Sequence, residues 1–150
     1  PGAGAEILTD SVKEIISPKK IDSDDWIRIM KESFELGLPA SATMMYGHVE
    51  TNNDIVEHYD KIVKLQKDLN GFMAFIPWSF EPNNTLMQKE GTVTTGAGGI
   101  QLLKMIAISR IIFDGLIDHI QSSWLTNGIG MAQLALQYGS DDFGGTLIGE

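Results

Sequence analysis

Apolar residues recur along this chain at two spacings, and segments of one spacing alternate with segments of the other. We expect a helix that Ser23 caps and that Gly37 and Pro39 end. Its helical apolar stripe consists of Trp26, Ile29, Met30 and Phe34. The next segment, Ala40–Tyr46, is small or apolar on both faces, which is typical of a parallel strand covered on both sides. The pattern therefore predicts a helix followed by a buried strand.

The same alternation continues along the rest of the chain. Thr51 and Asp54 have the spacing of a capping box, and the helix that they begin is expected to end at Asn70 and Gly71. A second buried strand is expected over 72–77, followed by a loop from Trp78 to about 96 that is long enough to be functional. The remaining predicted elements are a helix around 98–113, a strand over 117–123, a helix over 126–138 and a short strand over 143–148.

This order of elements predicts an α/β fold in which helices connect parallel strands. Two architectures have that order, an open doubly wound sheet and part of a (β/α)8 barrel. The segment "PGAGAE" has the glycines of a dinucleotide-binding turn but no preceding strand, which disfavours the open sheet. The barrel is favoured by small and polar residues within the strands, as a lumen around a ligand allows: Ser41, Thr43, Gln121, Ser122 and Ser123. In both architectures ligands bind at the carboxyl ends of the strands.

Composition narrows the class of protein. The chain has 150 residues, 43% of them hydrophobic, which suits one globular unit. No apolar run approaches the roughly 20 residues of a membrane-spanning helix, so we expect a cytoplasmic protein with no membrane partner. A net charge of −9 without a basic cluster disfavours nucleic acid as a partner. The first residue is Pro, and we expect a piece of a longer protein.

The turn after the first predicted strand contains the residues of greatest interest. Gly47 would let a ligand approach the backbone, and the carboxylate of Glu50 would accept hydrogen bonds from it; the alternative is a tight turn with solvated side chains. A metal site formed by His48, Glu50 and His58 is disfavoured, because the intervening helix is expected to turn His58 to solvent.

Other candidates follow later strands. Trp78 and Trp124 could stack on a flat ring or simply bury apolar surface. His119 starts a strand, at the end of a barrel that serves stability, and is expected to be structural. Asp141 and Asp142 are adjacent on an extended segment and face opposite ways, so we do not expect them to work as an acid/base pair.

Five ordered segments resemble the radical S-adenosylmethionine enzymes that make menaquinone and deazaflavin: "PGAGAEIL", "GLPASATMMYGHVET", "GFMAFIPWSFEPNNTL", "AISRIIFDGLIDHIQSSWLTNG" and "AQLALQYGSDDFGGTL". "FIPWSF" and "QSSWLTNG" indicate dehypoxanthine futalosine cyclase of menaquinone biosynthesis. Aminofutalosine synthase and deazaflavin (FO) synthase remain alternatives, because "TMMYGHVET" is shared more widely. From another class, a non-catalytic half-barrel that binds a metabolite is also an alternative.

The resemblance implies the carboxyl-terminal half of a TIM-type (β/α)8 radical S-adenosylmethionine barrel. In this family three cysteines spaced C-x3-C-x2-C hold a four-iron four-sulfur cluster whose open iron binds the cofactor. This chain has no cysteine, so the cluster ligands are expected in a missing amino-terminal half. A radical made from S-adenosylmethionine would take a hydrogen from the ribose of a nucleoside-linked benzoate, and the carbon radical would add to the ring.

The resemblance also implies site residues. Cofactor binding is implied for Thr43, Met45, Gly47 and Glu50, which match a G-x-I-x-G-x-x-E segment with Thr and Met in place of its first two motif residues. Contacts with the small-molecule substrate are expected from Glu6, His48, Trp78, Ser122 and Trp124. The resemblance assigns no catalytic residue and no metal ligand to this chain.

Overall fold

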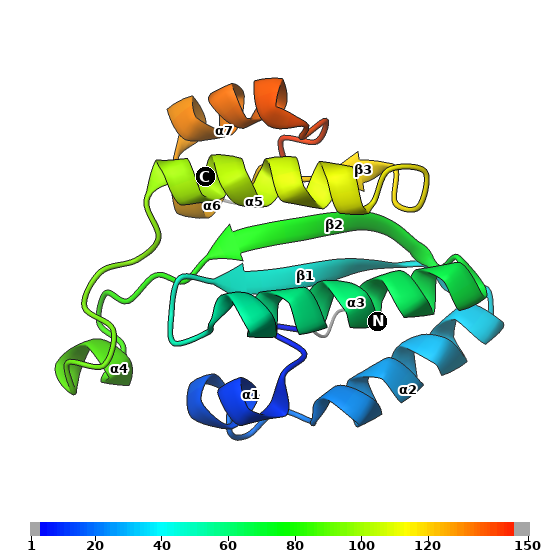
Figure 1. The fold of residues 1–150 in the computed structure, drawn as a ribbon, viewed down its shortest axis with the longest axis horizontal. Coiled ribbons are helices and arrows are strands. Elements are labelled where there is room, and N and C mark those ends of the chain that lie inside the picture. Colours follow the sequence, from blue (N-terminus) through cyan, green and yellow to red (C-terminus); the bar gives the residue numbers. More distant parts are fainter. Residues whose placement is uncertain (1–3, 146–150) are drawn as a thin grey trace.

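The computed structural model describes residues 4–145, which form a parallel sheet with helices packed on it (Figure 1). The sheet has three strands in the order β1-β2-β3, namely β1 (Ala40–Tyr46), β2 (Phe72–Ser79) and β3 (His119–Ile120). Both pairings are parallel. The α/β class and the parallel sheet that the sequence predicts are thereby confirmed.

Helices connect the strands, and α3 and α5 lie on the same face of the sheet (Figure 1). Within residues 4–145, no helix is both long and apolar enough to span a bilayer. The helices are α1 (Asp10–Ile16), α2 (Ser23–Glu35), α3 (Asn52–Leu69), α4 (Leu86–Lys89), α5 (Gly99–Ile112), α6 (Trp124–Asn127), α7 (Ile129–Ala135) and the 3-10 helix η1 (Leu136–Tyr138).

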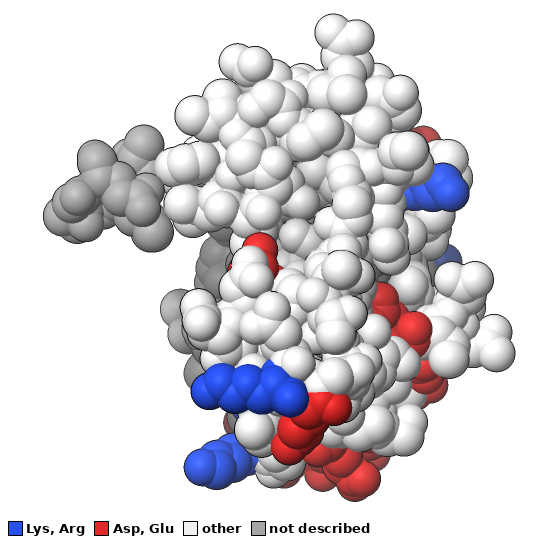
Figure 2. Space-filling model, turned by 90° about the vertical axis from the view of Figure 1, so that its left-hand side faces the viewer, with Lys and Arg blue, Asp and Glu red and all other residues white. Residues whose placement is uncertain are grey.

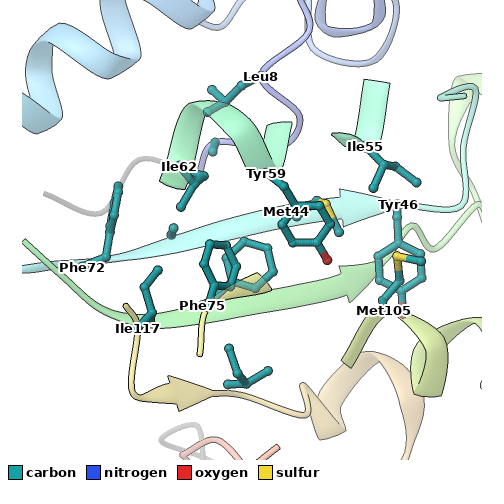
Figure 3. Close-up of a cluster of buried hydrophobic side chains, with 14 of the residues drawn as sticks. Leu8, Met44, Tyr46, Ile55, Tyr59, Ile62, Phe72, Phe75, Met105 and Ile117 are labelled. Carbon is teal, nitrogen blue, oxygen red and sulfur yellow. The ribbon is translucent and has the colours of Figure 1, made fainter. Parts of the chain in front are cut away.

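The main core lies between the sheet and these helices (Figure 3). Side chains alternate along a strand, so every second residue of β1 points to α3 and α5. Met44 and Tyr46 do so and are fully buried, as is Phe75 of β2. Tyr59 and Ile62 of α3 meet them from the helical side. Burying each of these side chains stabilises the fold by about 1.5–3 kcal/mol. Because these residues face the helices, the residues between them along each strand face the opposite side of the sheet.

The opposite side of the sheet is called the inner face here. It carries the alternate residues of β1 and β2, and in the strand register Thr43 lies beside Ile76 and Met45 beside Trp78. Ile76 and Trp78 are half-buried and Ser41 is exposed, unlike the fully buried residues toward the helices. The residues of the inner face are Ser41, Thr43, Met45, Ala74, Ile76 and Trp78.

Elements with strong local signals lie where the sequence predicts them. The strand Ala40–Tyr46 has the predicted bounds. The capping box is confirmed, since Thr51 N donates to Asp54 Oδ2 at 2.7 Å and the Thr51 hydroxyl accepts from Asp54 N. That helix ends at Asn70, which adopts the left-handed conformation with φ 47°. The helix expected around 98–113 is α5.

Several predictions are wrong in detail. The cap of α2 is Asp22, whose side chain accepts from Asp25 N at 2.8 Å, and not Ser23, which is buried. The strand expected over 117–123 contains only His119–Ile120. The helix expected over 126–138 is broken at Gly128, which has φ 78° and separates α6 from α7. The last expected strand is absent over 143–145, and its remainder, 146–148, lies outside the described residues.

The sequence patterns also missed two short helices, α1 and α4. They have only 7 and 4 residues, too few to show a helical period. Both lie toward the end of the molecule where β1 and β2 finish, at the left of Figure 1.

The side chain of Asp141 connects the last described segment to the start of β3 through hydrogen bonds and ion pairs. Its carboxylate lies 2.8 Å from His119 Nδ1 and 2.9 Å from the guanidinium of Arg110, and it accepts from Ile120 N at 2.7 Å. Arg110 also donates to the carbonyl of Gly139 at 2.7 Å. These contacts are consistent with the structural role expected for His119.

We expect a His119→Gln variant to change how stability depends on pH. The hydrogen bond and the charge of Asp141 raise the pKa of His119 above its ordinary value of about 6.5. This contribution to stability is therefore full below pH 6.5 and is lost as pH rises through the raised pKa. Melting temperatures of wild type and variant from pH 5.5 to 8.5 should converge at the alkaline end. If the melting temperatures of wild type and variant differed by the same amount at every pH, His119 protonation would not contribute to stability.

Candidate functional site

The turn after β1 is closed by the side chain of Glu50. Its two carboxylate oxygens accept the backbone N–H groups of Gly47 and His48 at 2.6 and 2.8 Å. Burial alone raises the pKa of Glu50, but the hydrogen bonds from His48 and Gly47 outweigh burial and hold that pKa below its ordinary value. The side chain is only 4% exposed, so Glu50 holds the turn as a buried, ionised acceptor.

His48 lies inside the same turn and does not face an open surface. Its side chain is 0% exposed, and its Nε2 lies 3.1 Å from the carbonyl of Met45. Its Nδ1 lies 2.8 Å from Val49 N and 2.9 Å from Glu50 Oε2. The ring also meets Phe80 edge to face. Both nitrogens of His48 are therefore engaged within the turn.

Gly47 is the point at which a second loop touches this turn. It has φ +85°, a conformation that side chains with a Cβ rarely adopt. A Cβ built on Gly47 would lie 2.7 Å from the Cβ of Ala97 and 3.0 Å from its backbone N. Ala97 belongs to the long loop after β2, so the close approach that requires glycine here is made by the chain itself.

A second segment runs beside β1 on its open edge. Ala5 N donates to the hydroxyl of Thr43 at 2.9 Å, and Met45 N donates to the carbonyl of Glu6 at 2.7 Å. Glu6 has φ 54°, an unusual conformation for a residue other than glycine, and is only 7% exposed. Its Oε1 pairs with Lys20, whereas its buried Oε2 has no hydrogen-bond partner among the described residues.

These features gather at the end of the molecule where β1 and β2 finish. Figure 2 views the molecule from that side. Its upper half, over α5 to α7, shows almost no charged side chain, whereas acidic and basic side chains gather below, where α1 and α4 lie. A ligand at this end would meet charged groups on one side only.

The carboxyl-terminal part of the chain matches a known protein family. Residues 69–150 match the family model described as "CofH/MqnC C-terminal region". That is more than half of the chain. The chain belongs to the CofH/MqnC family.

The CofH/MqnC chain is similar along its whole length to curated archaeal proteins named 5-amino-6-(D-ribitylamino)uracil–L-tyrosine 4-hydroxyphenyl transferase. It is 48% identical over 150 residues to the protein of Methanocaldococcus jannaschii, covering 100% of this chain and 42% of that protein. It is 41% identical to the protein of Methanococcus vannielii, again covering 100% and 42%. It is 44% identical to protein 1 of Methanosarcina barkeri, covering 100% and 40%.

The chain thus spans about two fifths of the length of these relatives. It is a CofH-like carboxyl-terminal region of a radical S-adenosylmethionine enzyme, as the five sequence segments indicate. The expected closest kinship with dehypoxanthine futalosine cyclase is not supported, because these relatives are hydroxyphenyl transferases. The alternative of a deazaflavin-type enzyme agrees better with them.

No set of residues in this CofH/MqnC chain fits the iron–sulfur cluster of the family. The chain has no cysteine. Over the described range 4–145, no group of three or more His, Cys, Asp or Glu side chains could hold a metal ion. His58, expected to face solvent, is instead fully buried, and its Nδ1 accepts a hydrogen bond from Leu8 N at 3.1 Å. Burial and the charges of Lys13 and Lys61 lower the pKa of His58 to about 3.

The four residues implied in cofactor binding do converge beside one turn. Thr43 and Met45 lie on the inner face, which leads into Gly47 and Glu50. Two of the polar groups are already engaged, the hydroxyl of Thr43 by Ala5 and the carboxylate of Glu50 by the turn itself. Met45 is only 6% exposed, and the half-buried Trp78 lies beside it in the strand register.

The five residues implied in substrate contacts do not all converge. Glu6 adjoins β1, and Trp78, expected just beyond a strand, lies within β2. Ser122 is fully buried, with its backbone N donating to Asp142 O at 2.8 Å. Trp124 starts α6, and its indole N–H donates to Gly145 O at 3.1 Å. The structure therefore brings Glu6 and Trp78 to the β1 side of the site and leaves Ser122 in the interior.

Sequence reasoning missed three residues at this site: Lys13, Lys20 and Ala97. Lys13 is 3% exposed, and Lys20 reaches Glu6 from the α1–α2 connection. The signal for Lys13 was weak, because α1 is too short to show its buried side. Nothing local marks Ala97, whose contact with Gly47 spans fifty positions of sequence.

Proposed function

We propose that the protein carrying this chain is a radical S-adenosylmethionine transferase that uses L-tyrosine and 5-amino-6-(D-ribitylamino)uracil. It transfers a 4-hydroxyphenyl-bearing group from the amino acid to the uracil. The observation that carries this proposal is the 48% identity over the entire chain to a protein of that name. The end of the molecule with charged groups on one side only suits a substrate that joins a charged headgroup to a neutral ring.

The chain contributes binding surfaces to this reaction. We propose that Met45 contacts the adenosine of the cofactor, while Gly47 and Glu50 shape the turn beneath it and Thr43 orients the neighbouring segment. S-adenosylmethionine supplies the radical chemistry when it is bound. The residues that hold the cluster belong, in this proposal, to the part of the protein that these 150 residues do not include.

We also propose substrate contacts, from the burial and the hydrogen bonds of the residues implied in them. Glu6 has a buried carboxylate oxygen that accepts no hydrogen bond from residues 4–145, and half-buried Trp78 offers an aromatic face. Trp124 lies farther along, at the start of α6, as a second aromatic contact. We assign His48 and Ser122 to positioning, because both side chains are fully buried.

The test uses the full-length enzyme, reconstituted anaerobically with iron and sulfide and supplied with S-adenosylmethionine and a reductant. We expect L-tyrosine and the ribitylaminouracil to be consumed together, with a coupled product detected by mass spectrometry. Dehypoxanthine futalosine should remain unchanged under the same conditions. Consumption of dehypoxanthine futalosine instead would refute the proposal.

The cyclase is the second candidate, because the matching family model covers MqnC as well as CofH. It predicts the opposite outcome in this assay, so one pair of incubations separates the two.

A further inference from the structure

His58 of α3 is fully buried and reaches the segment that runs beside β1. Its Nδ1 accepts the backbone N–H of Leu8 at 3.1 Å, across fifty positions of the sequence. Its Nε2 has no hydrogen-bond partner among residues 4–145. Burying a polar ring with one nitrogen unpaired costs free energy, and an aliphatic side chain would fill the same space without that cost. The presence of a histidine here therefore points to its bond with Leu8.

Lys61, three residues further along α3, holds the other backbone polar group of Leu8. Residues three apart lie on one face of a helix. Lys61 Nζ donates to the carbonyl of Leu8 at 2.6 Å and also pairs with Glu57 at 2.7 Å. The side chain of Leu8 is itself fully buried. His58 and Lys61 are together called the Leu8 anchor here, because they hold both the N–H and the carbonyl of Leu8.

Glu6 lies between the Leu8 anchor and a second attachment, at β1. There Met45 N donates to the carbonyl of Glu6 at 2.7 Å, and Ala5 N donates to the hydroxyl of Thr43 at 2.9 Å. Glu6 has φ 54°. A residue other than glycine is strained in this conformation and stays there only where its surroundings impose it. The attachments on both sides of Glu6 provide that constraint.

The Leu8 anchor requires a neutral His58. Because Nδ1 accepts from Leu8 N, the ring proton lies on Nε2. An imidazolium would carry a proton on both nitrogens and would oppose the N–H of Leu8 with another donor. Burial and the positive charges of Lys13 on α1 and Lys61 on α3 lower the pKa of His58 to about 3. The anchor is therefore intact at every pH near neutrality.

We propose that His58 and Lys61 are positioning residues, which hold Leu8 so that the carboxylate of Glu6 is presented to the substrate. They act through the backbone. Without the anchor, the segment from Glu6 to Leu8 relaxes to an ordinary conformation, and the side chain of Glu6 changes direction. The proposal rests on the proposed function, in which Glu6 contacts substrate. Neither His58 nor Lys61 is a catalytic residue, because both bind the backbone of this chain.

The test uses steady-state kinetics of the full-length, cluster-reconstituted enzyme with L-tyrosine and 5-amino-6-(D-ribitylamino)uracil. His58→Leu keeps the side chain close in size and removes the acceptor. It should raise the KM of the substrate that Glu6→Gln also affects, by about tenfold. Lys61→Met should raise the same KM. His58→Asn should restore most of the loss, because its amide oxygen takes the place of Nδ1.

A double-mutant cycle shows whether the anchor acts through Glu6. In the Glu6→Gln background, His58→Leu should raise KM much less than in wild type, because the carboxylate that it positions is already gone. Gln66→Leu is the matched control. Gln66 is another buried side chain of α3, and its Oε1 accepts from Phe72 N at 2.8 Å, so this variant also leaves a buried N–H unsatisfied. It should lower stability without changing KM.

Hydrogen exchange gives a readout that does not depend on turnover. The Leu8 amide should exchange faster in His58→Leu than in Gln66→Leu. Four results would each overturn the positioning role and leave the proposed function standing: wild-type KM in His58→Leu or in Glu6→Gln, additive effects in the cycle, equal defects in His58→Leu and His58→Asn, or unchanged exchange at Leu8. A wild-type enzyme that consumes neither substrate, with the expected exchange at Leu8, would refute the proposed function and with it the role of the anchor in substrate binding.

Discussion

Replacing Glu50 by Gln is expected to lower the free energy of unfolding by about 2–4 kcal/mol. The carboxylate accepts two backbone N–H groups, and the amide that replaces it turns one acceptor into a donor facing a donor. One buried N–H is then left unsatisfied. Chemical denaturation of the enzyme that carries this chain would measure the loss. Binding of S-adenosylmethionine should weaken in parallel, because the turn beneath its proposed site loosens.

Asp54→Asn is the matched control for this variant. Asp54 belongs to the capping box of α3, which is solvent-exposed, so the same change of charge should cost about 1 kcal/mol and leave cofactor affinity unchanged. The lowered pKa of Glu50 adds a second check. Its stabilisation is present above the ordinary carboxyl pKa and is lost as pH falls through the lowered one, so wild type and Glu50→Gln should converge in acid. Equal costs for the two variants at neutral pH would show that Glu50 is an ordinary surface carboxylate.

Gly47→Ala should be at least as damaging, at about 3 kcal/mol or more. The added methyl group forces a residue other than glycine to φ +85° and meets the Cβ of Ala97 at 2.7 Å. The measurement is again the free energy of unfolding, together with susceptibility of the loop over 80–98 to limited proteolysis, which should rise.

A double-mutant cycle separates the two causes. Ala97→Gly removes the methyl group that the new side chain strikes, so Gly47→Ala should cost less in that background. The residual cost then reports the backbone conformation and the 3.0 Å approach of Ala97 N. If the free-energy costs of the two substitutions were strictly additive, the Ala97 methyl group would not contribute to the cost of Gly47→Ala.

The sequence predicted this fold best where signals are local. The capping box at Thr51 and the left-handed end at Asn70 depend on residues a few positions apart, and both are correct. The region after Gly115 depends on pairing between distant segments. β3 is short because only Ala74 and Phe75 of β2 pair with it, and Gln121 then bridges to Asp142 instead. No local pattern carries that information.

At the candidate site, too, local features could be predicted from the sequence and contacts between distant segments could not. The position of the turn over 47–50 could be predicted, because a glycine and polar residues directly follow a strand. The partners of Gly47 and Glu6 could not, since Ala97 and Lys20 come from other loops. Within the family, the similar curated proteins are hydroxyphenyl transferases, so the alternative of a deazaflavin-type enzyme is better supported than the cyclase. The segments that carry the resemblance contain whole strands and parts of α5 and α7. The family model that matches over 69–150 covers CofH and MqnC together, so membership of the family does not by itself distinguish a cyclase from a transferase.

The contact between Gly47 and Ala97 has a practical consequence for chimeric enzymes. The connections after β1 and β2 lie so close together that one methyl group added at Gly47 would clash with Ala97. If only one of the two connections were taken from a relative, its side chains would contact a connection from a different parent, and the two could clash. Crossover points for exchanging specificity within this family should therefore lie before β1 and after the start of α5, so that both connections are inherited from the same parent.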